Sequence, residues 1–531
     1  MRRMGYLQGF KLIGTLPAAL SVVPDLRPDE MSTLSVIGHD IGGEREQLIL
    51  AAGGRYCTEW SEGAAGLYNS FPAVTSQLLG ATSFRRAYRT NHAYYAGSMA
   101  NGISSAEMVI KLGLAGYMGS FGSGGLSLDE VEKAIDEIQF RLPQGPYLIN
   151  LLHSPDDEDR EEAMVTLFLE KEVRAIEASA FVDPSPALIR YRLAGLTASD
   201  GGAYPHNHVI AKVSRSQVAT KFMSPPDAGV VASLLAKGLI TEDQAEWAEH
   251  VPVADDITIE ADSGGHTDNG PLISLLPMII DLRDEIQAER EYAQLIRVGA
   301  AGGIATPMSA AAGFEMGADY VVTGSVNQSC VEAGTSDYVK QVLARVDMAD
   351  VVMAPSADMF ESGARVQVIK ASTMYPMNAQ KLYDLYTRYS SIEDIPANDI
   401  TAIEKRLFHF DINTVWGYVT EYFTHADPRR LEKAEKNDKL KMALIFRWYL
   451  GNSSRWAITG DMDRRMDMQI WCGKSMGAFN QWAHGTVLEA PENRTVVAVA
   501  DAIMSGAALI IMENYLTLIG ITRGTENGYY Y

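Results

Sequence analysis

The sequence predicts an α/β fold built on a (β/α)8 TIM barrel. Between residues 91 and 330, short apolar runs alternate with amphipathic helical segments, a pattern typical of βα units and a parallel sheet. Eight alternations match the strand count of a TIM barrel. The expected strands are Ala93–Ala96, Tyr117–Phe121, Tyr147–Leu152, Ala175–Phe181, Val209–Val213, Ile257–Ala261, Ile296–Ala300 and Tyr320–Thr323. A doubly wound open sheet is the competing architecture, but the glycine clusters follow the late strands rather than the first, which favours the barrel.

The barrel is flanked by accessory units, because 531 residues exceed the length of one ordinary domain. The N-terminal region is punctuated by Gly and Pro and holds the β-like run Leu48–Ala52. Beyond residue 330 the alternation ends, and helices are expected at Asp337–Val346 and Ala379–Tyr389. The predicted units are an N-terminal irregular and β unit (1–90), the barrel (91–330), a helical cap insertion (331–395) and a helical C-terminal unit (396–531).

Composition excludes several classes of protein. The net charge of -22 argues against nucleic-acid binding, which needs a basic surface. The three cysteines, Cys57, Cys330 and Cys472, form neither a disulfide framework nor a zinc motif, and they fit a reducing, cytoplasmic setting. Lys11 interrupts the apolar stretch near the start, so we expect no signal peptide. We also expect no membrane span, because no run of about 20 apolar residues stands out.

Two glycine loops predict a phosphate-binding site. The seventh expected strand runs into Gly302-Gly303, and the eighth runs into Thr323-Gly324-Ser325. Glycines let backbone N–H groups approach an oxyanion, and barrels frequently bind phosphate with the loops after strands seven and eight. Either loop alone is equally consistent with an ordinary turn, but the pair favours a phosphate site.

The sixth expected strand leads into the candidate catalytic residue, His266. We expect the preceding residues Ser263, Gly264 and Gly265 to contact the cofactor, and they place this histidine in a loop at the ligand-binding end of the barrel. A neutral imidazole can donate or accept a proton near pH 7. The rival histidines are His153, just after strand three, and His206 and His208, which flank the start of strand five.

Residues near the ends of other strands are expected to line a cofactor. Met99, Ala100 and Asn101 follow the first strand, where small residues let a flat ring approach the backbone. Asn150 and Lys212 lie among apolar neighbours in strands three and five, and an unpaired buried polar group costs about 1–3 kcal/mol. Lys212 is a candidate to offset a phosphate or a reduced cofactor. The alternative for it is an ion pair with Glu177 or Glu260.

These motifs resemble a known superfamily. GSMANG (97–102), EADSGGHTDN (260–269), GAAGGIATP (299–307) and VVTGS (321–325) are similar to nitronate monooxygenases and flavin-type enoyl-ACP reductases, which are FMN-binding TIM barrels. Segments outside the barrel narrow the resemblance to the enoyl reductase component of polyunsaturated-fatty-acid synthases and trans-acting polyketide assembly lines. These segments are SADMFESGARVQVIK (356–370), KLYDLY (381–386), FRWYLGNSSRWA (446–457) and QIWCGKSMGAFNQW (469–482).

The resemblance implies a function. NADPH or NADH would reduce FMN, and the flavin would pass hydride to the β-carbon of a 2-enoyl thioester carried by an acyl carrier protein. His266 matches the active-site histidine, as an acid or a carbonyl orienter. By the same resemblance, Gly302, Gly303, Gly324 and Ser325 match phosphate-binding positions, and Met99, Asn101, Asn150 and Lys212 match positions that line the flavin. Other synthase domains and a second copy in a homodimer are further implied partners. Nitronate oxidation and a non-catalytic scaffold are the competing functions.

The densest cationic run is a candidate docking surface for the carrier protein. Its members are Arg429, Arg430, Lys433, Lys436, Lys439 and Lys441. The alternative is a solvated helix face paired internally with Glu432 and Glu435.

Overall fold

The structure is a computed structural model. It describes residues 34–41, 44–51, 56–59, 69–71, 74–154, 157–199, 202–265, 268–357 and 359–518. The start of the chain, for which no signal peptide is expected, and the candidate catalytic residue His266 lie outside the described residues.

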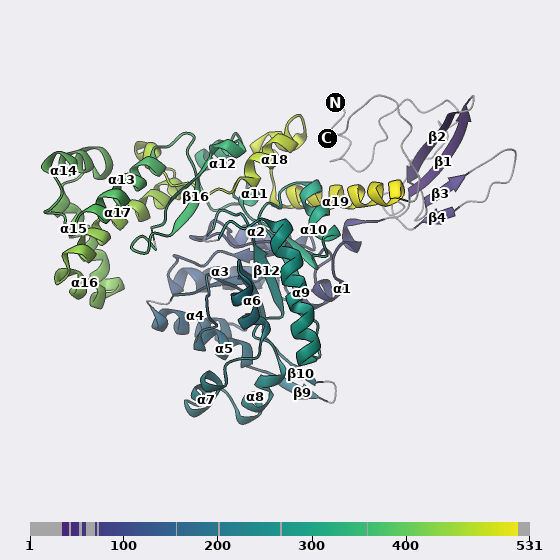
Figure 1. The fold of residues 1–531 in the computed structure, drawn as a ribbon, viewed down its shortest axis with the longest axis horizontal. Helices are drawn as coiled ribbons and strands as arrows, with labels where there is room; N and C mark the ends of the chain where they lie inside the picture. The colour runs from purple at the N-terminus through teal and green to yellow at the C-terminus, as the bar shows by residue number, and fades with distance from the viewer. Residues whose placement is uncertain are drawn as a thin grey trace.

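Eight parallel strands close into a barrel at the centre of the molecule (Figure 1). The order β11-β12-β13-β14-β5-β6-β7-β8 returns to its start because β8 pairs with β11. Each expected apolar run forms one strand, so the TIM barrel is confirmed and the open sheet is excluded. The strands are β5 (Tyr94–Ala96), β6 (Met118–Phe121), β7 (Leu148–Leu152), β8 (Ala175–Ser179), β11 (His208–Val213), β12 (Asp256–Glu260), β13 (Arg297–Ala301) and β14 (Tyr320–Thr323).

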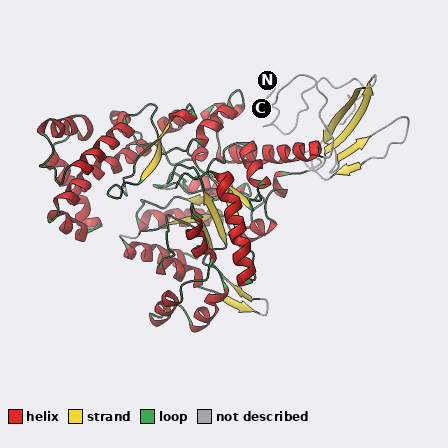
Figure 2. Ribbon diagram, viewed as in Figure 1, coloured by secondary structure: helices red, strands yellow, loops and turns green. Residues whose placement is uncertain are grey.

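Helices surround the barrel (Figure 2) and pack apolar residues against it. In Leu128–Arg141, for example, Ser127 and Glu130 form a capping box, and Val131, Ile135 and Ile138 recur at helical spacing to face the sheet. The surrounding helices are α2 (Ala106–Leu114), α3 (Leu128–Arg141), α4 (Glu158–Glu170), α5 (Pro186–Leu193), α6 (Ser216–Met223), α9 (Leu272–Arg290), α10 (Pro307–Glu315) and the short α11 (Ser325–Gln328). The hairpin β9–β10 (Thr197–Ser199, Gly202–Tyr204) and the helices α7 (Ala228–Ala236) and α8 (Glu242–Trp247) form an addition to the barrel next to α5.

The barrel interior is filled by stacked layers of side chains rather than by a pore. Tyr95 and Tyr320 both share a hydrogen bond with Thr258, at 3.0 and 2.9 Å. The Tyr320 ring lies over Gly299, where a Cβ would approach ring carbons to 2.1 Å, so only glycine fits beneath it. Helix α1 (Thr82–Tyr88) closes the N-terminal end of the barrel, with Phe84 stacked on Tyr320 at 4.3 Å. Ligands are therefore restricted to the opposite, C-terminal end of the strands.

The cap contains a β-hairpin that the helical expectation for residues 331–395 did not include. Strands β15 (Val351–Pro355) and β16 (Arg365–Ile369) pair antiparallel. Their β-branched residues favour strands over helix. The two expected helices form as α12 (Asp337–Leu343) and α13 (Tyr375–Arg388).

The C-terminal region divides between two cores. Helices α13 to α17 pack around a core of their own (Figure 1), whereas α18 and α19 contribute to the core of the barrel. The helices are α14 (Ala397–Ile403), α15 (Ile412–Ala426), α16 (Pro428–Glu435), α17 (Asp438–Thr459), α18 (Ser475–Ala483) and α19 (Val496–Leu518), with a π-helical turn at Glu404–Phe408.

Helix α19 corrects the expectation that the sequence holds no long apolar run. Among the described residues, Val496–Tyr515 is long and apolar enough to cross a membrane, with a mean hydropathy of 1.9. However, 56% of this stretch is buried inside the protein. Gly506 packs on Pro307 of α10, and Asp501 accepts a hydrogen bond from Tyr117 at 2.7 Å. The apolar composition of α19 is thus used to cover the barrel.

A four-stranded sheet precedes the barrel. Its order is β2-β1-β3-β4, and the expected run Leu48–Ala52 falls largely within β2. The strands are β1 (Leu34–Ile41), β2 (Glu44–Ala51), β3 (Tyr56–Glu59) and β4 (Asn69–Phe71).

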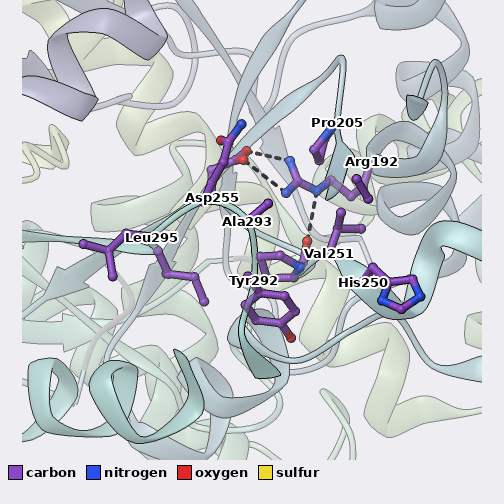
Figure 3. A pocket seen from close by; sticks show the side chains of 12 residues that line it. Arg192, Pro205, His250, Val251, Asp255, Tyr292, Ala293 and Leu295 are labelled. Carbon is purple, nitrogen blue, oxygen red and sulfur yellow. Dashed lines mark hydrogen bonds and ion pairs between the residues drawn. The ribbon is translucent and has the colours of Figure 1, made fainter. Parts of the chain in front are cut away.

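A hollow near the N-terminal ends of the strands is occupied by a buried ion pair (Figure 3). Arg192 donates to both carboxylate oxygens of Asp255, at 2.6 and 3.1 Å, and to the carbonyl of Pro252 at 3.0 Å. Burial alone would raise the pKa of Asp255, but the charges of Arg192 and His208 outweigh it and hold that pKa well below its usual range. The hollow is therefore structural.

This pair predicts a specific acid dependence of stability. The folded pKa of Asp255 is depressed, so its contribution is fully present above the unfolded pKa of about 3.9 and is lost as pH falls below it. Unfolding free energies measured between pH 4 and pH 2 should fall more steeply for the native chain than for Asp255→Asn, by up to about 1.4 kcal/mol per pH unit. Equal slopes would show that Asp255 titrates normally.

Candidate active site

A charged trio occupies the inner layer at the C-terminal end of the barrel. Lys212 of β11 lies 3.5 Å from a carboxylate oxygen of Glu177 in β8 and 3.1 Å from one of Glu260 in β12. Glu177 is fully buried, and its other oxygen accepts the backbone N–H of Ser98 at 2.9 Å. The ion pair weighed as the alternative for Lys212 is thus present, with both candidate partners.

Lys212 keeps its charge within the trio. Burial lowers the pKa of Lys212, but the carboxylates of Glu260 and Glu177 outweigh it and raise the pKa above its ordinary value, so the ammonium stays protonated. Two carboxylates already compensate this single charge. Lys212 is therefore placed to hold Glu177 and Glu260 in position rather than to act as a free cation opposite a phosphate.

The loop after β5 is fixed by backbone contacts. Met99 exchanges hydrogen bonds with Ser104, its N–H donating to the hydroxyl at 3.0 Å and its carbonyl accepting the N–H at 3.2 Å. Asn101 adopts a left-handed conformation (φ 57°) and donates its N–H to Gly124 at 2.6 Å. Ala100 is exposed, while Met99 is half-buried. Backbone rather than polar side chains forms this side of the barrel mouth.

Asn150 finds its partners within the protein. Its side-chain amide donates to the carbonyl of Glu177 and to the hydroxyl of Ser179, both at 2.9 Å. The backbone carbonyl of Asn150 accepts a hydrogen bond from the hydroxyl of Ser123 at 2.5 Å. The sequence correctly marked a buried polar group that must be paired, but these donors join β7 to β8 instead of reaching a ligand.

The two glycine loops leave open space beside bare backbone. A Cβ added at Gly303 (φ 81°) or at Gly324 would meet no atom within 4 Å, and neither N–H donates to any described residue. Gly302 (φ 84°) instead allows close packing, because a Cβ there would lie 2.7 Å from the carbonyl carbon of Ala261. Gly324 precedes α11, whose N-terminus has no side-chain cap. This pair of loops suits an oxyanion.

The side chains after β14 divide between two tasks. The hydroxyl of Thr323 is buried and bonds to Tyr94 at 2.6 Å and to Asn327 at 2.9 Å, so it faces the core rather than the open space. The hydroxyl of Ser325 accepts the N–H of Gly473 at 2.8 Å and retains its proton for donation.

The loop after β12 is anchored at both ends. Ser263 donates to Glu260 at 3.3 Å, and the N–H of Asp262 bonds to the carbonyl of Gly270 at 3.1 Å. At the far end, Asp268 accepts from Arg215 at 2.6 and 2.5 Å and from Ser214 at 2.8 Å. Residues 263–265 thus lie beside Glu260, and Asp268 is tied to the segment that follows β11.

Of the rival histidines, His153 directly follows β7 at the C-terminal end of the strands, whereas His206 and His208 lie at the start of β11. His153 stacks on the buried ring of Phe181 at 4.6 Å and bonds to Glu161 of α4 at 2.9 Å. His208 lies at the start of β11, 3.3 Å from Asp255, and His206 packs beside Gly195. Each of these three histidines contacts other residues of the protein, whereas His266 lies outside the described residues.

The accessory segments contribute residues that sequence reasoning did not single out. The side-chain amide of Gln367, in β16, donates to Asp262 and to Asn269, the latter at 3.0 Å. Lys474 lies 3.4 Å from Asp262. The signal for Gln367 was available, because it is a polar residue between two valines in a β-branched run, the same pattern that marked Asn150.

Comparison with known proteins agrees with this geometry. A model of the nitronate monooxygenase family matches residues 88–382, which include the whole barrel and most of the cap. The chain belongs to the nitronate monooxygenase family. The enoyl reductase domain of MlnA, from the macrolactin biosynthesis cluster of Bacillus amyloliquefaciens, is 41% identical in sequence. Its crystal structure superposes with a TM-score of 0.80 over 83% of this chain and 99% of that one.

Curated relatives confirm the narrower resemblance to enoyl reductase components. A component of the polyunsaturated fatty acid synthase from a Thraustochytrium species is 46% identical over 82% of this chain and 30% of its own length. Polyketide biosynthesis protein PksE from Bacillus subtilis is 45% identical over 86% of this chain and 59% of its own length. The chain thus spans between about a third and three fifths of the length of these two relatives.

The helical unit has a separate relationship. Residues 389–468 match the inserted helical domain of [acyl-carrier-protein] S-malonyltransferases. Within this unit the expected cationic run is partly used internally: Arg430 lies 3.3 Å from Glu361, Lys439 donates to the carbonyls of Tyr386 and Tyr389, and Lys441 lies over the ring of Trp416. Arg429, Lys433 and Lys436 of the same run are exposed.

Proposed function

We propose that this chain is an FMN-dependent enoyl reductase, which uses NADPH or NADH to reduce the 2,3-double bond of enoyl thioesters on an acyl carrier protein. The observation that carries the proposal is the pair of open glycine loops after β13 and β14, next to the charged inner layer of the barrel. The similarity to the enoyl reductase domain of MlnA, which covers nearly all of that domain, supports the reaction class.

The residues at the mouth fit a flavin mononucleotide. The N–H groups of Gly303 and Gly324 and the hydroxyl of Ser325 would hold its phosphate, as oxyanion sites in barrels do. The loop Met99–Asn101 would support the ring, with Asn150 and Lys212 beneath it as braces of the inner layer. Bound FMN would supply hydride transfer between the nicotinamide and the β-carbon of the substrate.

The chain itself would manage the proton and the substrate carbonyl. His266, in the loop after β12, would donate a proton or orient the thioester carbonyl, since imidazole does either near pH 7. The surrounding trio of Glu177, Lys212 and Glu260 keeps a fixed charge arrangement below the loop. The hydrogen bonds of Ser263 and Asp268 hold the loop at either side of His266.

Anaerobic titration tests this function. Purified protein should bind FMN, NADPH or NADH should bleach the bound flavin in the absence of oxygen, and a long 2-enoyl thioester should restore the oxidised spectrum. Nitronate oxidation does not require a nicotinamide, so a flavin that resists both nicotinamides but is reduced by a nitronate would replace the proposal with that activity. If the protein bound no flavin, the non-catalytic scaffold would be the remaining function of the three considered.

His266→Ala should separate cofactor binding from turnover. The variant is expected to keep the flavin spectrum and to lose roughly two to four orders of magnitude in enoyl reduction, the usual contribution of a positioned acid or base. Steady-state assays with a 2-enoyl thioester measure the loss. Full activity in this variant would remove His266 from the mechanism.

A further inference from the structure

We propose that Gln367 is a positioning residue of the active site. Its side-chain amide ties the cap hairpin to both ends of the loop after β12, and it thereby holds the segment that carries His266. The catalytic meaning of this brace depends on the proposed function, but the brace itself is a property of the apoprotein and can be measured without turnover.

One side-chain amide bonds both ends of the loop. Nε2 of Gln367 donates to a carboxylate oxygen of Asp262 and to the side-chain oxygen of Asn269, 3.0 Å away. These two residues bracket the segment 263–268, and the backbone bond from Asp262 to Gly270 closes its base at 3.1 Å. A hydrogen bond to an ionised carboxylate is about twice as strong as one between neutral groups. The contact therefore restrains the loop where it leaves β12 and where it approaches α9.

The cap fixes Gln367 in this orientation. Val366 and Val368, its neighbours in β16, are buried in the core of the helical unit, so Gln367 projects from the opposite face of the strand. The carbonyl of Gln367 accepts the N–H of Cys472 at 3.2 Å. Gln367 is only 3% exposed, and its side-chain oxygen has no hydrogen-bond partner among the described residues. This oxygen remains able to accept a donor at the mouth of the barrel.

The neighbouring segment Cys472–Lys474 extends the brace to the phosphate loops. Lys474 lies 3.4 Å from the other oxygen of Asp262, and Gly473 donates its N–H to Ser325 at 2.8 Å. The backbones of Gly264 and Gly473 pass so closely that a Cβ on Gly473 would lie 3.2 Å from the nitrogen of Gly264. One wall built from cap and C-terminal segments thus contacts both the loop after β12 and the start of α11.

Amide hydrogen exchange on the full chain without FMN tests the brace. In Gln367→Met, which keeps the side-chain volume and removes the donors, peptides covering residues 261–270 should exchange at least about fivefold faster than in the native chain. The matched control is Gln380→Met, because Gln380 lies in the same cap and, within the part of the chain that the structure describes, its side chain bonds only to Arg365 and Asp384. This control should leave the loop unchanged. Unchanged exchange in Gln367→Met, or faster exchange spread evenly over the barrel, would overturn the proposal.

Kinetics provide the second measurement. With FMN bound, Gln367→Met should lower kcat for the enoyl thioester by about tenfold or more, while the dissociation constant for FMN and the KM for the nicotinamide stay within about twofold of the native values. A fall in thermal stability with unchanged kcat would show that Gln367 serves packing alone and would overturn the positioning role. A native chain that reduces no enoyl thioester would refute the proposed function, and the exchange measurement would still decide the brace.

Gln367→Glu keeps the inference testable if the methionine variant does not fold. A neutral glutamic acid can donate one hydrogen bond to Asp262, whereas its carboxylate cannot donate and repels Asp262. The exchange rate of residues 261–270, relative to that of the native chain at the same pH, should therefore rise as pH increases. A ratio that does not vary with pH would overturn the proposal.

Discussion

Gly324→Asp should abolish flavin binding without unfolding the protein. A side chain at Gly324 enters open space, since a Cβ there meets no atom within 4 Å, and the backbone (φ -126°) does not require glycine. A carboxylate placed about 4 Å from a phosphate would repel it by about 4 kcal/mol per pair of unit charges at an effective dielectric constant of ~20, before salt screening. Fluorescence titration should show the dissociation constant for FMN rising at least about a hundredfold.

Gly324→Asn is the matched control, because it has the same shape without the charge. It should weaken FMN binding at least about tenfold less than the aspartate variant, and the difference should shrink at high salt. Both variants should keep the unfolding midpoint of the native apoprotein, since neither meets a neighbour. Native affinity in Gly324→Asp would show that the phosphate, if bound, lies elsewhere, and the assignment of both glycine loops would fall.

The sequence predicted the barrel because its strands are buried apolar runs of strand length. It also predicted which loops would expose bare backbone, since glycine is the residue that permits φ values of 84° and 81° at Gly302 and Gly303. What it missed are polar residues whose partners are distant in the chain. Gln367 and Asp262 are 105 positions apart, and no local pattern pairs them.

The hairpin β15–β16 shows a second reason why the sequence pattern failed to predict part of the fold. Pro355 ends the first strand and a 9-residue connection separates it from the second, so neither strand has a short turn signal beside it. The neighbouring helices α12 and α13 dominated the local pattern. In the barrel itself, the expected strand Ile257–Ala261 begins one residue after Asp256, which belongs to β12, whereas Arg297 lies inside the expected strand Ile296–Ala300; both charged side chains are buried.

That buried pair gives the largest expected effect on stability. Arg297 donates to both carboxylate oxygens of Asp256 at 2.6 Å, and Tyr88 donates to the same carboxylate from helix α1. Asp256 is fully buried and Arg297 is 4% exposed. Removing one partner of a buried pair leaves an uncompensated charge, at a cost of about 3–5 kcal/mol. Chemical denaturation of Arg297→Met should show a loss of this size in the free energy of unfolding.

Removing the whole cluster should cost less than removing the arginine alone. The triple variant Tyr88→Phe, Asp256→Leu, Arg297→Met removes both charges and the hydroxyl of this cluster, and replacing buried ion pairs with apolar residues of similar size is often close to neutral. It should therefore recover at least about half of the stability lost in Arg297→Met. If the triple variant were the less stable of the two, the pair would be a net source of stability in its own right. If Arg297→Met cost under about 1 kcal/mol, the bond between Arg297 and Asp256 would not exist in solution.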